Sequence, residues 1–362
     1  MARAVGLFAA LLLLGCGGEY SLGAWPDGAV LDAGLDAQIP GDCWPDFSHR
    51  VRITVDGRSY DDPLADFPIL VSLPPGALGT GIARDDGADL RFVLADCTPL
   101  PHEVETWDPA ATSHVWVRLP QAGARATHDL DLYFGDPTAS DVSSPNGVFT
   151  ADYVGVYHLD EDDPFRDSSA SRSPPGSNRS TTATEAQVGD GRLVGGGSVV
   201  VSDNPFPVGE SPRSVCVWNR TDDDGASYYW MFSYGIGDRP VGAFALGRHG
   251  EQLQCQGADG TTLVGYDVYI PGDRSWRYSC CTYGEGQARL YSDGAHVIER
   301  ARAWPVTPST ANLGSAQSGS NSWIGAIDEV RVSSVVRSDD WIAAEHASMT
   351  GALVTIGALE PR

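Results

Sequence analysis

Alternating hydrophobic and polar residues predict several strands in the first part of the chain. Within residues 49–57, Val51, Ile53 and Val55 alternate with polar residues, and a glycine ends the segment. Because successive side chains of a strand point to opposite faces, this period of two is typical of a strand with one buried face. We expect a small all-β domain over residues 46–140, because similar segments occupy residues 67–74, 89–96, 113–120 and 128–137.

Strand-like segments continue through the rest of the chain, with one short helix near its end. Residues 276–294 have the pattern of a hairpin, because a glycine-containing turn separates two strand-like segments. Residues 323–334 form another strand, and Ser338 then suits the N-cap of a helix of about ten residues that ends near Gly351. A closing strand follows. Helical periodicity is rare and the chain has 42 Gly and 24 Pro, so we expect an all-β chain with a second domain over 148–362.

The N-terminal residues have the pattern of an export signal. A hydrophobic segment of about ten residues follows Arg3; it is too short to cross a bilayer but long enough for a signal peptide. It ends in Leu-Leu-Gly-Cys, which resembles the lipobox of bacterial lipoproteins. The resemblance implies a signal peptide over 1–15 and lipidation of Cys16. The segment 16–45 is rich in Gly, Ala, Asp and Pro, which predicts a flexible acidic tether. The alternative is an ordinary secretory signal in which the cysteine occurs by chance.

Charge and the residue after Cys16 bear on location and partners. Gly17, where some lipoproteins have aspartate, implies the outer membrane or the cell surface. The formal net charge is −24, and every basic residue is an arginine. Such a chain repels nucleic acid, so the expected location is the cell envelope, with the membrane contacted through the lipid anchor.

Six further cysteines are expected to form disulfides, because an even number in an exported chain is typical of cross-linked domains. Two precede residue 150 and four follow it, so each part can pair internally, and Cys43–Cys97 is the natural pair of the first part. The other four allow three connectivities. Adjacent residues on a strand face opposite sides, so Cys280 and Cys281 are not expected to pair with each other. The remaining two are Cys216 and Cys255.

The first domain resembles a known bacterial family. The segments FPILVSL, ADLRFV, LPHEVETWD, HVWVRLP and HDLDLYFGDPTA, within residues 47–140, resemble the domain of unknown function DUF2341. That family often precedes a concanavalin A-like domain in surface proteins and implies no activity. In HEVETW, Glu103 and Glu105 share one face of a strand. Paired carboxylates can perform acid–base chemistry, but acids that alternate along a strand more often form its solvated side.

The second domain resembles the concanavalin A-like, laminin G-like (LamG) jelly-roll β-sandwich. The resemblance rests on YVGVYHLDE with FRDSSAS, on SVCVWNR, and on residues 276–294 and 323–346, and it covers nearly all of 150–362. Glycosidases of this fold carry an E-x-D-x-E strand, which these residues lack. They also lack G-x-S-x-G and H-E-x-x-H. We therefore expect no enzymatic activity.

Two acidic residues lie in the middle of the strand at 324–333. Strict alternation places Asp328 on one face with Val330, and Glu329 on the other with Arg331. A carboxylate on a hydrophobic face is costly unless it is paired, so Asp328 requires an explanation. The three alternatives are a metal ligand, a carboxylate held by backbone N–H groups or an arginine, and a catalytic acid.

The resemblance makes calcium one of these alternatives. In several concanavalin A-like proteins an aspartate on the penultimate strand binds a structural Ca²⁺ together with backbone carbonyls. Asp328 matches that position, and Asp160 and Asp167 are candidate neighbours. Calcium prefers six to eight oxygen ligands, which carbonyl partners would complete.

A loop and the strand after it supply the candidate ligand site. Residues 228–235 are hydrophobic on both faces, which favours core packing. The loop before them is the better candidate, because loops at the edge of a sandwich often bind ligands. The candidate ligand-binding residues are Asp222, Asp223, Asp224, Tyr228 and Trp230.

The predicted function follows from fold analogy more than from a motif. We expect a membrane-anchored surface lipoprotein with a non-catalytic, carbohydrate-binding role, or one that binds another cell-surface ligand. The alternatives are a divergent glycan hydrolase, which needs an acid pair facing a cleft, and a purely structural envelope component, which needs no groove.

Overall fold

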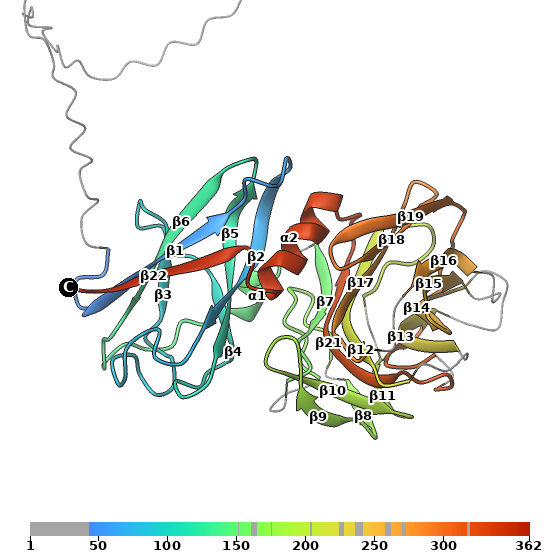
Figure 1. The fold of residues 1–362 in the computed structure, drawn as a ribbon, viewed down its shortest axis with the longest axis horizontal. Coiled ribbons are helices and arrows are strands. Elements are labelled where there is room, and N and C mark those ends of the chain that lie inside the picture. Colours follow the sequence, from blue (N-terminus) through green and yellow to red (C-terminus); the bar gives the residue numbers. More distant parts are fainter. Residues whose placement is uncertain are drawn as a thin grey trace, which may run out of the picture. The chain divides into compact units, whose positions relative to one another are not determined.

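Two β sandwiches make up most of the chain that the structure describes (Figure 1). These residues belong to one compact unit, Pro40–Arg362, so contacts between the sandwiches are part of the fold. The computed structural model describes residues 43–362 except 151, 161–164, 175, 203–204, 224–227, 236–241, 258–261, 270–272 and 317–318. Of residues 262–268 it describes the backbone alone.

The first sandwich packs a four-stranded sheet, in the order β22-β1-β6-β3, against a three-stranded sheet, in the order β2-β5-β4. Val51, Ile53 and Val55 are fully buried between them, so the predicted alternation along β1 is confirmed. Its strands are β1 (His49–Asp56), β2 (Pro63–Leu73), β3 (Arg91–Val93), β4 (His102–Thr106), β5 (Ser113–Gly123), β6 (Thr127–Phe134) and β22 (Val354–Pro361).

The second sandwich has an eight-stranded sheet, in the order β19-β18-β17-β12-β21-β10-β9 with β7 beside β21, and a seven-stranded sheet, in the order β16-β15-β14-β13-β20-β11-β8. The predicted all-β fold is therefore confirmed. Its strands are β7 (Tyr153–Tyr157), β8 (Ser177–Arg179), β9 (Thr182–Glu185), β10 (Asp190–Gly195), β11 (Ser198–Val201), β12 (Arg213–Thr221), β13 (Tyr228–Gly235), β14 (Ala243–His249), β15 (Gln252–Gly257), β16 (Thr262–Tyr269), β17 (Arg277–Gly284), β18 (Gln287–Ser292), β19 (Ala295–Ala301), β20 (Ala311–Leu313) and β21 (Ile324–Ser333).

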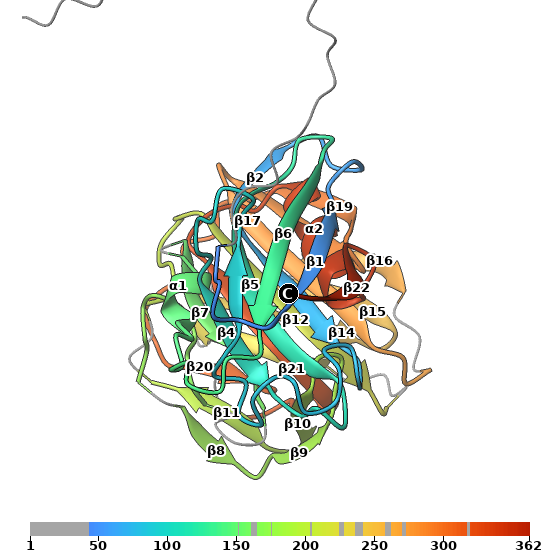
Figure 2. The same cartoon turned by 90° about the vertical axis from the view of Figure 1, so that its left-hand side faces the viewer.

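The last strand of the chain belongs to the first sandwich, so the prediction that it closes the second domain is wrong. β22 pairs antiparallel with β1, from His49 opposite Pro361 to Val55 opposite Val354. Figures 1 and 2 show the chain returning to lie beside its first strand. Without β22, β1 would be a sheet edge with unpaired backbone groups. The alternation of β22 predicts a strand but not the sheet that it joins.

A short helix connects the two sandwiches. Ser338 caps α2 (Asp339–Met349) by accepting a hydrogen bond from the Trp341 N–H, as predicted. Trp341 packs edge-on against Phe67 of β2, with ring centroids 4.9 Å apart. On the other side, the Trp218 indole of β12 donates to Met349 Sδ. The remaining helix, α1 (Pro145–Val148), has one turn, and no helix in the described part of the chain is long and hydrophobic enough to cross a membrane.

Three disulfides cross-link the described residues. Cys43–Cys97 is the pair predicted for the first part. Cys280 and Cys281 face opposite sides of β17 and pair with different partners, as expected. Cys216–Cys280 joins neighbouring strands β12 and β17, and Cys255–Cys281 joins the two sheets of the second sandwich.

Candidate functional site

A β-bulge decides where the two acids of β21 point. On β12, Cys216 and Trp218 are two residues apart, but their partners on β21, Arg331 and Asp328, are three apart. The extra residue is accommodated at Glu329, whose φ of 48° lies in the left-handed region that side chains rarely adopt. The expected strict alternation is therefore wrong, because the bulge brings Asp328 onto the face of Arg331.

Asp328 is fully buried and is held by backbone donors. Its Oδ2 accepts a hydrogen bond from the Val188 N–H at 2.9 Å, and its Oδ1 accepts one from the Glu329 N–H at 2.8 Å. Burial raises the pKa of Asp328 well above its ordinary value, and the carboxylates of Glu329 and Glu105 raise it further. This arrangement matches the alternative of a carboxyl group held by the backbone.

Glu329 pairs with two buried bases. Its Oε1 lies 2.6 Å from Nδ1 of His158, and its Oε2 accepts two hydrogen bonds from Arg331. Burial opposes the charged form of Glu329, but His158 and Arg331 lower its pKa to about 2. Burial also opposes protonation of His158, yet Glu329, Glu105 and Glu103 together raise the pKa of His158 well above its ordinary value.

Two acids of the first sandwich complete this group. Glu103 and Glu105 of β4 have fully buried side chains, so the expectation that they form the solvated side of a strand is wrong. Glu103 Oε1 accepts hydrogen bonds from Arg166 at 2.6 Å and from Ser168 at 2.7 Å. Burial raises the pKa of Glu105 to about 8. We call Glu103, Glu105, His158, Asp328, Glu329 and Arg331 the interface cluster.

Arg331 continues the interface cluster to α2. Its Nη1 donates to Glu345 at 2.7 Å, and Glu345 also accepts hydrogen bonds from the hydroxyls of Tyr153 and Tyr278. The Arg331 guanidinium lies 4.3 Å from the ring centroid of Trp116 on β5, a cation–π contact with the first sandwich. The cluster therefore joins the two sandwiches through charges rather than hydrophobic contacts alone.

The interface cluster contains the chemical groups of an acid–base catalyst, but among the residues that the structure describes a substrate has no access to them. A carboxyl group with a pKa of about 8 near an imidazole is a typical general-acid arrangement. A polymer must reach such groups within hydrogen-bond distance. In the described structure, however, Glu103, Glu105 and Glu329 have fully buried side chains and that of His158 is 3% exposed. No acid pair of this cluster faces an open cleft.

The predicted calcium ligands are not gathered into one site. Asp167 is buried, and its carboxylate accepts hydrogen bonds from the backbone N–H groups of Val156, Ser169 and Ser173. Among the described residues, the grouped potential metal ligands are instead Glu105, His158 and Glu329, which offer donor atoms within 4.8 Å of one another. Neither Asp328, Asp160 nor Asp167 belongs to that group.

The predicted ligand residues lie at one end of the second sandwich. Asp222 pairs with Arg220 at 3.8 Å, and these two residues with Arg274 line a hollow of about 440 Å³. The Arg220 guanidinium lies 5.3 Å from the ring centroid of Trp276. Asp223 follows, and its backbone N–H donates to Thr221 Oγ1. Asp224 lies outside the described residues.

An aromatic stack lies at the start of β13 and the end of β14. Tyr228 is half-buried and stacks on His249, with ring centroids 4.0 Å apart and planes 11° apart. Trp230 lies 6.1 Å from Tyr228 and is 6% exposed. A hydrogen bond of 2.8 Å from Arg248 to Thr221 ties the ends of β14 and β12 together. The predicted core packing of this strand is confirmed further along, where Phe232 and Tyr234 are buried. We call Arg220, Asp222, Tyr228, His249, Arg274 and Trp276 the rim.

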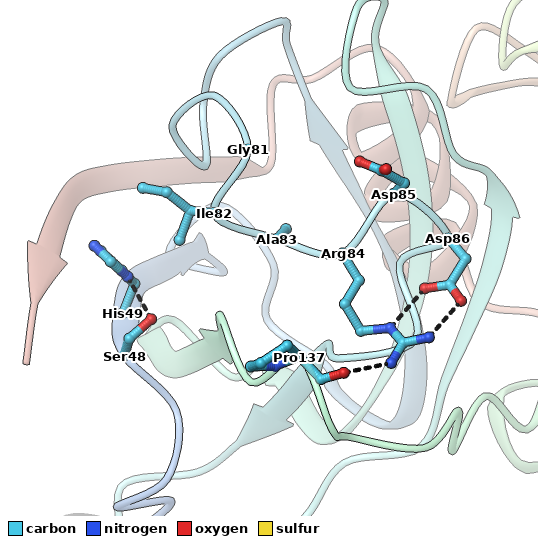
Figure 3. A pocket seen from close by; sticks show the side chains of 9 residues that line it. All are labelled: Ser48, His49, Gly81, Ile82, Ala83, Arg84, Asp85, Asp86 and Pro137. Carbon is cyan, nitrogen blue, oxygen red and sulfur yellow. Dashed lines mark hydrogen bonds and ion pairs between the residues drawn. The ribbon is translucent and has the colours of Figure 1, made fainter.

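A larger hollow lies in the first sandwich (Figure 3). It measures about 890 Å³, and its lining contains no Trp, Tyr or Phe among the described residues. Arg84 pairs with Asp86 at 2.7 Å and donates to the Pro137 carbonyl at 2.8 Å. Since the Arg84 guanidinium is already engaged and no described Trp, Tyr or Phe lines the space, this hollow offers less to a sugar than the rim.

Sequence reasoning missed the interface cluster, although signals for it were present. Each of the segments HEVETW, YHLDE and IDEVRV places acids or a histidine inside a strand-like pattern. Acids in a strand can face water or a second domain, and the periodicity is the same in both cases. Cys16, predicted to be lipidated, lies outside the described residues.

Two family models match the chain. Residues 86–162 match the domain of unknown function DUF2341, and residues 193–343 match the concanavalin A-like lectin/glucanases superfamily. The first match runs past residue 140 and includes His158 along with Glu103 and Glu105. No curated protein matches the chain.

Solved structures similar to the chain are distant. Domain 4 of AbnA, an extracellular arabinanase from Geobacillus stearothermophilus, in complex with arabinotriose, has a TM-score of 0.45 and 16% identity over 53% of this chain and 96% of that domain. The binding domain of Paraclostridial Mosquitocidal Protein 1 has a TM-score of 0.44 and 13% identity over 54% of this chain. The botulinum neurotoxin serotype D ligand binding domain, in complex with N-acetylneuraminic acid, has a TM-score of 0.43 and 13% identity over 56% of this chain.

The chain spans about half of the two toxin domains, at 52% of each. At these identities and TM-scores, no ligand is transferred to this chain. The order of the two family matches agrees with the resemblances drawn from the sequence. The chain carries a DUF2341 domain followed by a domain of the concanavalin A-like lectin/glucanases superfamily.

Proposed function

We propose that this protein is a non-catalytic glycan-binding protein, held at the outer membrane or cell surface by lipid on Cys16, and that the rim is its binding site. The observation that carries the proposal is the flat stack of Tyr228 on His249. The hydrogen bond from Arg248 to Thr221 links the strand of His249 to the end of β12. There Arg220 and Asp222 line the hollow together with Arg274. Ligand sites are concave and combine a hydrophobic surface with a few polar groups. A sugar ring presents C–H groups to an aromatic face and hydroxyls to charged neighbours.

The burial of the interface cluster supports a non-catalytic role. Glu105 has the raised pKa that a general acid needs, but Glu105 and Glu103 are both buried between the sandwiches. The one acid of the rim, Asp222, lies on the surface instead and already pairs with Arg220. These facts favour binding over the hydrolase alternative. That Asp328 binds Ca²⁺ stays a prediction.

A glycan array with the purified protein tests the proposal and identifies the ligand. For the best glycan, we expect Tyr228→Ala to weaken binding at least about tenfold in calorimetry, which corresponds to about 1.4 kcal/mol. His49→Ala, in the hollow of Figure 3, is the matched control because it removes an aromatic ring from the other hollow, and it should leave the affinity unchanged. If His49→Ala lost binding while Tyr228→Ala kept it, the binding site would lie in the first sandwich instead.

Two further measurements separate the alternatives. Release of reducing ends from the bound glycan would overturn the non-catalytic role and favour the hydrolase. An array without any bound glycan, on protein shown to be folded, would favour a structural envelope component. For the anchor, Cys16→Ser should shift the protein from the membrane to the soluble fraction, and wild-type protein without an acyl chain would contradict lipidation.

A further inference from the structure

One imidazole lies among three buried carboxyl groups from both sandwiches. Nδ1 of His158 lies 2.6 Å from Glu329 Oε1 and 3.4 Å from Glu105 Oε2, and Nε2 lies 3.4 Å from Glu103 Oε2. Glu103 and Glu105 come from β4, Glu329 comes from the bulge of β21, and His158 directly follows β7. All four side chains are at most 3% exposed.

Several of these buried atoms have no hydrogen-bond partner among the described residues. They are Glu103 Oε2, Glu105 Oε1 and Nε2 of His158. A buried polar atom without a partner costs about 1–3 kcal/mol, and buried polar groups are nearly always satisfied by protein, water or an ion. Glu103 Oε2 and Nε2 of His158 lie 3.4 Å from each other, so Glu105 Oε1 is the buried atom that most needs a further ligand.

The charges of the cluster point to a cation. Together with its ionic partners Glu345 and Arg166, the interface cluster has five carboxyl groups and three bases. Two carboxyl groups are therefore left without a base. Burial of an unpaired carboxylate is too costly to persist, so protons or a metal ion must balance the excess.

We propose that Glu105, His158 and Glu329 bind one divalent transition-metal ion of the zinc class and that Glu103 positions the imidazole. Their donor atoms already lie within 4.8 Å of one another. An imidazole nitrogen suits zinc and other transition metals, which also accept carboxylate oxygens, whereas calcium prefers an all-oxygen shell. The three ligands come from three elements, so the ion joins the first sandwich to the second.

The surrounding contacts suit this role. With the ion at Nδ1, the Nε2–H of His158 points to Glu103 Oε2. In many metal sites a carboxylate in this position orients the bound imidazole. Arg331 donates to Oε2 of Glu329 and the Trp116 indole donates to Oε2 of Glu105. Oε1 of Glu105 then has no partner among the described residues, and Oε1 of Glu329 lies beside Nδ1 of His158. Charge is conserved if the ion replaces two protons, one on Glu105 and one on the imidazole.

Elemental analysis of the complete protein tests the site. After loading with Zn²⁺ and removal of free metal, we expect about one ion per chain. Glu105→Gln should bind at least about tenfold more weakly, and Glu103→Gln about 10–100-fold more weakly. The amide of Glu105→Gln has the shape of a protonated carboxyl group, so this variant keeps the metal-free fold while losing a ligand. Near-UV circular dichroism checks that it is folded.

His102→Gln is the matched control, since His102 is buried on β4, the strand of Glu105, but lies on the opposite face beside Phe92. It should retain the transition-metal ion, and a chelator should lower the Tm of wild type and His102→Gln but not of Glu105→Gln. Wild-type protein that binds no Zn²⁺ or Mn²⁺ under these conditions would overturn the proposal. So would equal metal content in wild type and folded Glu105→Gln, or binding of Ca²⁺ alone that is lost in Asp328→Asn. None of these results depends on whether the rim binds glycan.

Discussion

The two faces of β21 are buried to the same extent but stabilised in opposite ways. On one face, Ile327, Val330 and Val332 are fully buried in the hydrophobic core between the two sheets of the second sandwich. On the other face, Asp328 and Arg331, with Glu329 at the bulge, are equally buried against the first sandwich. One strand therefore belongs both to a hydrophobic core and to a charged interface.

The difference lies in how many partners each face needs. A hydrophobic side chain packs against any neighbour of suitable shape, so it needs only neighbours that fill the surrounding volume. A buried charge needs particular partners at hydrogen-bond distance, and Arg331 finds them in Glu329, in Glu345 of α2 and in the ring of Trp116. The charged face therefore fixes the position of β21 relative to two elements that its hydrophobic face does not contact, α2 and β5.

β4 repeats the contrast in the first sandwich. His102 and Glu103 are neighbours in the chain and both are buried, but they point to opposite faces. Glu103 meets the cations Arg166 and His158, whereas His102 packs beside Phe92 with ring centroids 5.2 Å apart. On the face without ionic partners, the polar side chain stays neutral.

The largest effect is expected from breaking the charged face. Arg331→Met fills similar space but leaves Glu329 and Glu345 without their common partner, and loss of one member of a buried pair costs about 3–5 kcal/mol. Urea unfolding of the purified protein measures the change. A loss below about 1 kcal/mol would mean that the interface is held by hydrophobic contacts and that the network contributes little.

Lowering the pH should reduce the free energy of unfolding through His102, the buried neutral histidine of β4. Burial lowers the pKa of His102 to about 4; the neighbouring Arg91 lowers it further and Asp141 opposes this effect. The unfolded chain takes up the proton near pH 6.5 but the folded chain resists until about pH 4, so stability falls as the pH drops between these values. The loss due to His102 is about 3 kcal/mol at pH 4.

The difference between wild type and His102→Gln isolates this group, because the carboxylates titrate in both proteins. Unfolding free energies measured from pH 7.5 to pH 4 should fall more steeply for wild type. If the unfolding free energies of the two proteins fell in parallel with pH, His102 would take up its proton in the folded protein as readily as in the unfolded chain. Burial would then not lower its pKa.

Local features of the fold could be predicted from the sequence. The alternation of Val51, Ile53 and Val55, the cap at Ser338 and the pairing of Cys43 with Cys97 depend on neighbours or on simple counting, and all three are found. The side of a strand that meets a second domain cannot be predicted in this way. Glu103 finds Arg166 63 residues later, and Glu329 finds His158 171 residues earlier.

Two errors share one physical cause. β22 was expected in the second domain because sequence order suggests it, whereas backbone pairing placed it on β1. The acids of β21 were assigned to faces by strict alternation, which the bulge at Glu329 interrupts. A glycine or asparagine would have signalled a left-handed residue, but glutamate does not. Tertiary contacts impose both features, so no local pattern reveals them.

The hydrophobic face should respond mildly to a conservative change. Ile327→Val removes one methylene from a fully buried side chain, and such changes cost about 0.5–1.5 kcal/mol because the core relaxes around the small cavity. Urea unfolding again supplies the measurement. A loss as large as that of Arg331→Met would remove the distinction between the two faces, since it would show that the core depends equally on a particular shape.

The smallest effect on the free energy of unfolding is expected at a solvent-exposed ion pair. Arg289 of β18 donates to Glu299 of β19 at 3.1 Å, but their side chains are 37% and 53% exposed. Water screens both charges, so Arg289→Met should change the unfolding free energy by about 0–1 kcal/mol, against about 3–5 kcal/mol for the same substitution at Arg331. The two variants exchange the same residues in the same sheet, and only burial and the number of partners differ. Equal losses in urea unfolding would mean that the side-chain exchange itself, rather than the sealed network, sets the stability of the charged face.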